Sequence, residues 1–538
     1  MFGLHGHFYQ PPREDPATGV MAHEPSAAPF HDWNERITAE CYRPNGWARV
    51  VDERGRIVVI VNNFEVMSFD LAPTLARWMA VHAPDVLERI VAADRSANTA
   101  IAHPFHHVIL PFATPRDRAT ELLWGRTEFE YRFGRRPLGV WLPETAMDSD
   151  TIAAVTAAGY RFTIALPHQV SATATVVEHR GCRIVVADDV LSRQLAFGVF
   201  GGDADAVIAA AARSAAARGH ALATTDGETF GHHHKWTERT VAFALGVQAR
   251  RLGWQVGSFE GLVGAPAAPS DVVASAWSCA HGLERWRSDC GCRNGDFGVV
   301  DQRWRGPLRT ALEAVRDVAH LVFDTAGREV FVEPWLARDD YASVLCDASE
   351  TEPFMQRHGR AGASSATALA LLESQRHALG MFTSCAWFFD DIGRLESKIA
   401  MRIAAECLRQ LQLAGHGAAA TAARQTCRDA LAATVSHDPT LGTGADIWDA
   451  VLREERTTNA PIMARPDVQL IERAIAGVGI DDPTAWARRA SGAERDRAQE
   501  LVYEALATGE RRDLDSVGEA LGLAVAEISR RRRVGATR

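Results

Sequence analysis

Short apolar runs alternate with helical patterns along the first half of the chain. The apolar runs lie at residues 2–4, 99–102, 138–141, 161–166 and 221–223. Between them, helix-like patterns cover residues 72–92, 116–133, 150–158 and 204–217. Because strand-then-helix alternation is typical of parallel strands joined by right-handed crossovers, this half is predicted to be an α/β structure.

Most of these predicted strands end in side chains that can carry out chemistry. The strand ends carry His5, His7, His103, Glu144, His168 and Asp226. Such residues at the ends of many parallel strands favour a (β/α) barrel, whose active site lies at the carboxyl ends of its strands. An open doubly wound sheet is the alternative, but no glycine-rich phosphate loop follows the first strand.

Turn and helix signals divide the rest of the chain. Two β-branched runs within residues 48–61 surround an Asp-Glu-Arg-Gly turn and predict a hairpin, inside an inserted segment at about residues 8–62. Amphipathic stretches at residues 366–381, 394–414 and 494–507 predict helices. We therefore expect a barrel over residues 1–265, a Cys/Trp-rich connecting loop over 266–306 and a mainly helical domain over 307–538.

Composition and charge narrow the expected partners. The chain has 538 residues, of which 47% are hydrophobic and 23% charged, as in a globular protein of two or three domains. A net charge of -10 disfavours nucleic acid and anionic membranes, so a neutral polymer or small molecule is expected. Without a signal-peptide pattern or a membrane-spanning stretch, the protein is expected to be cytoplasmic, with its nine cysteines mostly as thiols. The sequence does not indicate an oligomeric state.

Two acids at strand ends, Glu144 and Asp226, are candidates for a catalytic pair. A retaining glycosidase holds a nucleophilic carboxylate and a protonated general acid about 5–5.5 Å apart. Taken singly, Glu144 is also explained as a turn residue after Pro143, and Asp226 as a helix N-cap. The two acids alone leave these interpretations open.

Four sequence blocks give this pair a context. They read LHGHFYQPP (residues 4–12), FHHVILPF (105–112), GVWLPET (139–145) and TTDGETFGHHH (224–234). In this order they resemble the motif regions of glycoside hydrolase family 57. The resemblance implies a (β/α)7-type distorted barrel followed by helices, acting on α-glucans with retention of configuration. It also implies Glu144 as nucleophile and Asp226 as acid/base, with no catalytic metal and no cofactor. Amylases, debranching enzymes, glucanotransferases and branching enzymes share these motifs, so the type stays open.

Histidines and aromatic residues supply the candidate substrate contacts. His5 and His7 lie two apart on one strand, so their side chains share a face. Such a pair can bind a metal, whereas the resemblance implies hydrogen bonds to sugar hydroxyls. The three consecutive histidines of residues 232–234 point about 100° apart on a helix and cannot all reach one ion. The predicted contacts are His5, His7, His107, Trp141, Glu228, His232, His281, Trp286, Trp387 and Asp390.

Two further segments admit several interpretations. In SAWSCAHGLERWRSDCGC (residues 275–292), we favour a loop that places His281 and Trp286 at the sugar. A Cys₃His zinc site comes second and a disulfide third, because the C-x-H and C-x-C spacings are tighter than usual. In MFTSCAWFFDDIGRLE (residues 381–396), Trp387 and Asp390 either contact substrate, as in a similar Trp-rich segment of the family, or belong to the core. The zinc-site ligands would be Cys279, His281, Cys290 and Cys292.

Two other functions compete with the α-glucan hypothesis. A metal-dependent deacetylase-like or mannosidase-like enzyme would use His5, His7 and Asp226 as ligands. A glycan-binding protein without catalysis would bind oligosaccharides through the same residues.

Overall fold

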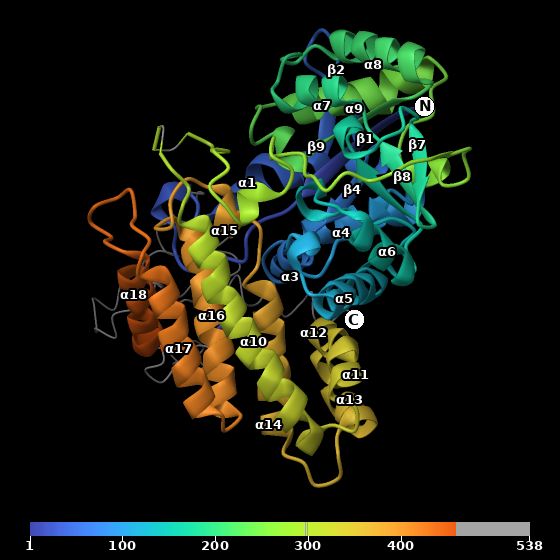
Figure 1. Ribbon diagram of the computed structural model, residues 1–538. Helices are drawn as coiled ribbons and strands as arrows, with labels where there is room; N and C mark the ends of the chain where they lie inside the picture. Colours follow the sequence, from blue (N-terminus) through green and yellow to red (C-terminus); the bar gives the residue numbers. More distant parts are fainter. Residues whose placement is uncertain (296, 299, 459–538) are drawn as a thin grey trace, which may run out of the picture. The chain divides into compact units, whose positions relative to one another are not determined.

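The computed structural model describes residues 1–458 except 296 and 299 (Figure 1). Residues 1–455 form one compact unit, to which the description below refers. The helix predicted at residues 494–507 lies outside the described residues. Among the helices of the described range, none is both long and apolar enough to cross a membrane.

Four parallel strands form the sheet that carries most strand-end residues. Its order is β5 (Ala100–Ile101), β4 (Ser68–Leu71), β1 (Phe2–Phe8) and β9 (Ala221–Asp226). The register pairs His7 with Asp70 on one side and with Asp226 on the other. Parallel pairing thus brings three polar residues, from distant parts of the chain, side by side at one edge of the sheet.

A second four-stranded sheet lies next to the first. It contains β6 (Phe162–Ala165), β8 (Cys182–Val186), β7 (Val176–His179) and β10 (Ala268–Pro269), and β6 and β8 run parallel. Isolated parallel bridges join Ala102 to Val140 and Gly139 to Phe162. The Asp188 amide donates to the Leu222 carbonyl, next to β9.

The neighbour order therefore runs β1, β4, β5, residues 139–140, β6, β8, β9 and back to β1. This is the order expected of a distorted seven-stranded barrel, with weak pairing at β5 and at residues 139–140. The α/β class of this half is confirmed.

Helices of the first half follow the sequence pattern with one exception. The pattern matches α5 (Pro115–Phe133), α6 (Ser149–Ala157) and α8 (Ala204–Arg218). The single helix predicted at residues 72–92 is wrong, because α3 (Pro73–His82) ends before α4 (Pro84–Ala97) begins. Proline cannot donate the amide hydrogen bond that a continuous helix requires at this position. Pro84 instead occupies the first turn of α4, where that donor is not needed.

The inserted segment contains short helices and the predicted hairpin. Its elements are α1 (Trp33–Ile37), a π-helix (Thr38–Tyr42), α2 (Arg43–Gly46), β2 (Ala48–Val51) and β3 (Ile57–Val61). The two strands pair antiparallel, and Gly55 takes a left-handed conformation (φ 73°) in the turn between them.

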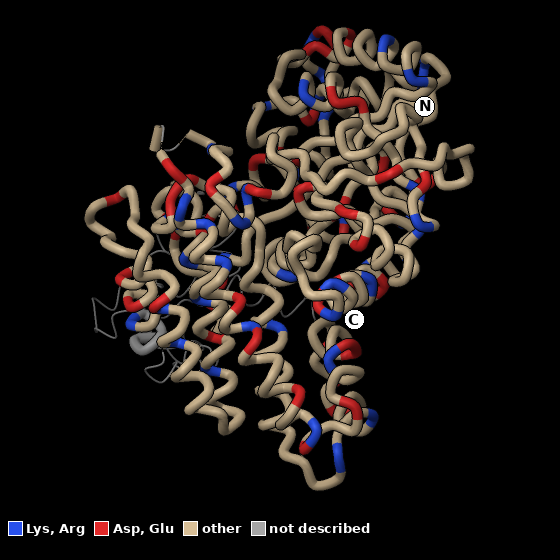
Figure 2. Tube along the Cα trace, viewed as in Figure 1, with Lys and Arg blue, Asp and Glu red and all other residues tan. Residues whose placement is uncertain are grey.

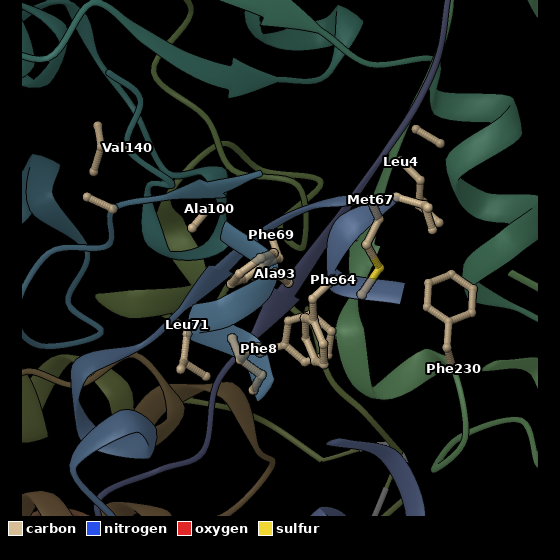
Figure 3. Close-up of a cluster of buried hydrophobic side chains, with 14 of the residues drawn as sticks. Leu4, Phe8, Phe64, Met67, Phe69, Leu71, Ala93, Ala100, Val140 and Phe230 are labelled. Atoms are coloured by element: carbon tan, nitrogen blue, oxygen red, sulfur yellow. The ribbon is translucent and has the colours of Figure 1, made fainter. Parts of the chain in front are cut away.

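Buried aromatic and aliphatic side chains fill the space around β1 and β4. Figure 3 shows Phe8 and Phe64 in contact beneath the strands, close to Phe69 and Leu71. A Cβ atom at Gly227 would lie 2.3 Å from the Phe8 ring. Only glycine therefore fits directly after Asp226, where the chain leaves β9.

Long helices build the second half of the unit. They are α10 (Arg305–Val330), α14 (Ser365–Gly380), α16 (Leu395–Leu413), α17 (Gly417–Leu431) and α18 (Gly444–Thr458), and α14 and α16 match the predicted stretches (Figure 1). A smaller group, α11 (Pro334–Asp340), α12 (Ala342–Cys346) and α13 (Thr351–His358), lies beside α5. There the fully buried Arg338 donates to Asp117 at 2.8 Å.

Candidate active site

A cleft of about 1120 Å³ opens between the strand ends and the helical half. Residues from both parts line it, so neither half forms it alone. Of the predicted site residues, six line the cleft: His7, His107, Glu144, Asp226, Glu228 and His232. The other six do not contact it within the described chain: His5, Trp141, His281, Trp286, Trp387 and Asp390.

Glu144 occupies a strained turn immediately after residues 139–140. Its backbone is left-handed (φ 59°, ψ 18°), a conformation that costs a non-glycine residue free energy and is often found at functional sites. The Trp277 amide donates to the Glu144 carbonyl at 3.0 Å and helps to hold this turn.

Three side-chain donors orient the Glu144 carboxylate. The Trp277 indole N–H donates to Oε2 at 3.0 Å and the Ser278 hydroxyl to the same oxygen at 2.5 Å. The Ser384 hydroxyl donates to Oε1 at a longer 3.5 Å. Charged acceptors make the stronger hydrogen bonds, so these donors fix the direction in which the carboxylate faces the cleft.

Asp226 lies at the end of β9 on the floor of the cleft. Its side chain is exposed to the cleft space. The protein walls around the cleft keep much of the bulk water away, and this desolvation raises the pKa of Asp226 to about 6; the nearby Glu144 and Asp70 raise it further, against the opposing effect of His7. A carboxyl group of this kind holds a proton far more often than an ordinary aspartate near neutral pH.

Glu228 is a second acid with an altered proton affinity. It is buried and accepts hydrogen bonds from the Tyr42 hydroxyl at 2.6 Å and from Gln10 Nε2 at 3.5 Å. Burial raises the pKa of Glu228 to about 8, with a further contribution from Asp226. Glu228 is therefore mostly neutral at pH 7. Because Tyr42 comes from the inserted segment, that segment completes the site.

A chain of hydrogen bonds links the strand ends to the helical half. It runs from Asp70 to His7 Nδ1 (2.9 Å), from His7 Nε2 to His107 Nε2 (3.0 Å), from His107 Nδ1 to Ser384 (2.7 Å) and on to Glu144. Burial lowers the pKa of His7 to about 4 and raises the pKa of Asp70. A protonated Asp70 that donates to a neutral His7 satisfies every link of this chain, and we assign the protons in that way.

His5 and Trp141 lie behind this chain. Both ring nitrogens of His5 are engaged, by Ser68 at 3.0 Å and by Asp70 at 3.1 Å. Trp141 is fully buried and stacks on His5 and His7, with ring centroids 4.9 and 5.1 Å away. These two residues therefore support His7 from the barrel interior.

Three buried histidines converge near the same strand ends. The ring nitrogens of His7, His103 and His107 lie within 4.8 Å of one another. His103 Nε2 is buried and has no hydrogen-bond partner in the described structure. Burial lowers the pKa of His103 to about 4, so the ring is neutral, as a metal ligand must be. This set differs from the predicted ligands His5, His7 and Asp226.

The three consecutive histidines have three different environments. His232 bonds to Glu40 at 2.6 Å, and His233 also lines the cleft. His234 faces away and bonds to the Ala196 carbonyl at 3.0 Å.

The Cys/Trp-rich loop approaches the cleft through residues that the sequence did not single out. Trp277 and Ser278 line the cleft, whereas Trp286 is fully buried in the helical core. All nine cysteines of the chain are free.

The aromatic segment at residues 381–396 also divides between core and cleft. Trp387 is fully buried and donates to the Arg305 carbonyl at 3.0 Å. Asp390 accepts from the backbone amides of Asn294 and Gly295 and so holds the Cys/Trp-rich loop. Phe388 and Phe389 line the cleft instead.

The residues missed from the sequence are chiefly donors to the two acids. They are Trp277, Ser278, Ser384 and Tyr42. Trp277 and Ser278 lie just before Cys279, and Ser384 lies in the aromatic segment at residues 381–396. The spacing of these three residues does not predict contact with Glu144.

Two family models match this chain, one in each half. The model of "Glycosyl hydrolase family 57" matches residues 42–245, and that of "Domain of unknown function (DUF3536)" matches residues 301–476. A search of curated proteins gives no significant match.

Solved structures show the fold. The exo-type maltose-forming amylase of Pyrococcus sp. ST04 aligns with a TM-score of 0.63 at 15% identity, over 86% of this chain and 92% of that one. The GH57-type branching enzyme of Pyrococcus horikoshii aligns with a TM-score of 0.49 at 13% identity, over 85% and 94%. The first of these likenesses confirms the α/β half followed by a helical half.

Proposed function

Residues 42–245 match the model of glycoside hydrolase family 57, and we propose that the chain is a member of this family that cleaves or transfers α-glucosidic bonds with retention of configuration. One observation supports this above all. Two carboxyl groups line one cleft, one of them, Glu144, held by three donors and the other, Asp226, with a raised pKa. That division of roles is what double displacement requires.

In the first step, Glu144 attacks the anomeric carbon while Asp226 donates its proton to the glycosidic oxygen. The C–O bond to the leaving sugar breaks, and a covalent glycosyl-enzyme forms. In the second step, Asp226 removes a proton from water or from an acceptor hydroxyl, which displaces Glu144. The acceptor decides between hydrolysis and transfer.

The cleft lining combines aromatic surface with hydrogen-bonding groups, which suits a sugar chain. Tyr9, Phe388 and Phe389 offer aromatic surface, and the neutral His7 and His107 offer ring nitrogens for hydroxyl groups. In the view of Figure 2, acidic and basic residues are interspersed along the described chain. An uncharged oligo- or polysaccharide is therefore our proposed substrate.

Glu144→Gln tests the proposal most directly. We expect kcat to fall by about 10⁴-fold or more, because the neutral amide cannot form the glycosyl-enzyme. The control is Asp150→Asn, which changes an exposed acid at the start of α6 and should leave kcat unchanged.

The substrates are amylose, glycogen, pullulan and malto-oligosaccharides, with NMR of the first-formed anomer. Products of inverted configuration would exclude double displacement. Oligosaccharide binding without turnover would identify a glycan-binding protein.

The histidine set His7, His103 and His107 favours a second candidate, a metal-dependent carbohydrate hydrolase or deacetylase. The unpartnered Nε2 of His103 fits a divalent ion, and Asp70 would orient His7 from behind. Here His103→Ala would abolish turnover and remove one bound metal ion per chain. Under the glycosidase proposal, His103→Ala and the wild type should contain the same amount of bound metal.

A further inference from the structure

Four potential metal ligands come together in the Cys/Trp-rich loop. The side-chain donor atoms of Cys279, His281, Cys290 and Cys292 all lie within 4.8 Å of one another. Cys292 Sγ is 3.9 Å from Cys279 Sγ and 3.5 Å from His281 Nδ1. Tetrahedral zinc, with bonds of about 2.3 Å to sulfur and 2.0–2.1 Å to nitrogen, would separate two sulfurs by about 3.8 Å and sulfur from nitrogen by about 3.6 Å.

We propose that these four residues bind one structural Zn²⁺ ion. Three thiolates and one imidazole form a soft ligand set that favours zinc over calcium or magnesium. Four protein ligands complete the tetrahedron and leave no position for substrate, which is typical of structural sites. This zinc site is separate from the histidine set in the cleft and does not depend on the proposed function.

A buried arginine beside the cluster supports a bound metal. Arg305 is fully buried, lies 3.9 Å from Cys290 Sγ and donates to the Cys292 carbonyl at 3.0 Å. Asp390 attracts this guanidinium, and so do Cys290 and Cys292 when they are thiolates. A Zn²⁺ ion with three thiolates and one neutral histidine carries one net negative charge, which would compensate the buried guanidinium.

The zinc site would join the two ends of a loop that has little regular structure. Between Cys279 and Cys292, the loop contains a single short 3-10 turn (Glu284–Trp286). Its anchors are the buried Trp286 and the bonds from Arg285 to the carbonyls of Ser278 and Phe388. A metal that ties the first two ligands to the last two fixes the loop at its base.

Fixing the loop positions two donors to Glu144. Trp277 and Ser278 directly precede the first ligand, Cys279, and both donate to Glu144 Oε2. The zinc ion is therefore assigned a positioning role, while the reaction itself proceeds on Glu144 and Asp226. This consequence, unlike metal binding, rests on the proposed function.

Metal content tests the proposal without any substrate. The full chain, purified under reducing conditions, is analysed for metals by mass spectrometry, and its thiols are titrated. We expect one zinc ion per chain, and at least a tenfold loss of zinc in Cys290→Ser/Cys292→Ser. Cys346→Ser is the matched control, a half-buried cysteine outside the cluster, and should retain its zinc.

Two further variants distinguish loss of the zinc site from misfolding. His281→Cys should still bind zinc through four thiolates, while His281→Ala should bind it more weakly. Cobalt substitution of the wild-type chain should give the visible absorption of tetrahedral thiolate-bound cobalt. A wild-type chain without zinc, with all cysteines titratable, would overturn the proposal, as would a mass lower by two hydrogens from a Cys279–Cys292 disulfide.

Kinetics separate the positioning role from the zinc site. Removal of zinc by chelator should lower kcat with little change in KM, and added zinc should restore it. If the wild type binds zinc but Cys290→Ser/Cys292→Ser has an unchanged kcat, the zinc site stands and its positioning role is refuted. Zinc binding in a chain without glycosidase activity would refute only the proposed function.

Discussion

The barrel rim and the helical half contribute to the cleft in different ways. The rim supplies His7 and Asp226 from strand ends, where parallel pairing sets their positions to within one residue of register. It supplies Glu144 from the strained turn that follows residues 139–140. The helical half and the loop before it supply donors such as Ser384 and Trp277, which reach Glu144 from irregular backbone. The reactive groups are thus placed on strands or directly after them, and the groups that orient Glu144 are placed by tertiary packing.

After Glu144→Gln, replacing Asp226, the proposed proton donor at the rim, should have the largest effect. Asp226→Asn is expected to lower kcat on a glucan by about 10²- to 10⁴-fold. In the wild type, activity should fall as pH rises through about 6, because the Asp226 proton is lost there. Aryl glycosides with good leaving groups need little protonation, so the variant should recover much of its rate of glycosyl-enzyme formation on them. An equal loss on both substrates would contradict the assignment.

The next effect concerns stability in the helical half. Trp387→Ala should lower the free energy of unfolding by about 3–5 kcal/mol, because it removes a fully buried aromatic side chain. Phe388→Ala, which changes a cleft residue, should instead raise KM. Denaturant unfolding and steady-state kinetics on both variants measure the contrast. A raised KM with unchanged stability in Trp387→Ala would place Trp387 at the sugar, as the sequence suggested.

Removing a donor to Glu144, the proposed nucleophile, should have a smaller effect. Trp277→Phe deletes the indole N–H that bonds to Glu144, and the loss of a hydrogen bond to a charged group corresponds to about a 10- to 100-fold fall in kcat. Trp236→Phe changes an exposed tryptophan and serves as the control. If both variants behave alike, the connecting loop does not orient the carboxylate.

Glu228→Gln should have the smallest effect on activity, within about threefold at pH 7, because Gln resembles the neutral acid in shape and hydrogen bonding. Its effect on stability depends on pH. The pKa of Glu228 is about 8 in the folded chain, against an ordinary value of 4.5. Between these values the folded state keeps a proton that the unfolded state has lost, so wild-type stability falls as pH rises from 5 to 8. Denaturant unfolding at both pH values should show a smaller fall in the variant.

The sequence indicates the barrel rim better than the rest of the site. His7, Glu144 and Asp226 follow apolar runs, and strand geometry brings such residues to one edge. The same reasoning could not separate Trp387 from Phe388, because adjacent aromatic residues give no sign of which one faces the core. It also could not find Tyr42 or Ser384, whose contacts with Glu228 and Glu144 span 186 and 240 residues.

Helix boundaries show the same limit on a smaller scale. Periodicity located α5 and α8 within one or two residues but merged α3 with α4, since apolar spacing continues across Pro84. The backbone donor that proline lacks decides the break.

The sequence separation of Glu144 and Ser384 also affects when the site is completed during translation. A ribosome adding about 5–20 residues per second needs roughly 12–48 s to synthesise the 240 residues that separate them. In the later part of that interval, once Asp226, Trp277 and Ser278 have been added, the nascent barrel carries both acids but lacks the helical wall of the cleft and the Ser384 donor to Glu144. The growing chain therefore completes the cleft only late in its translation.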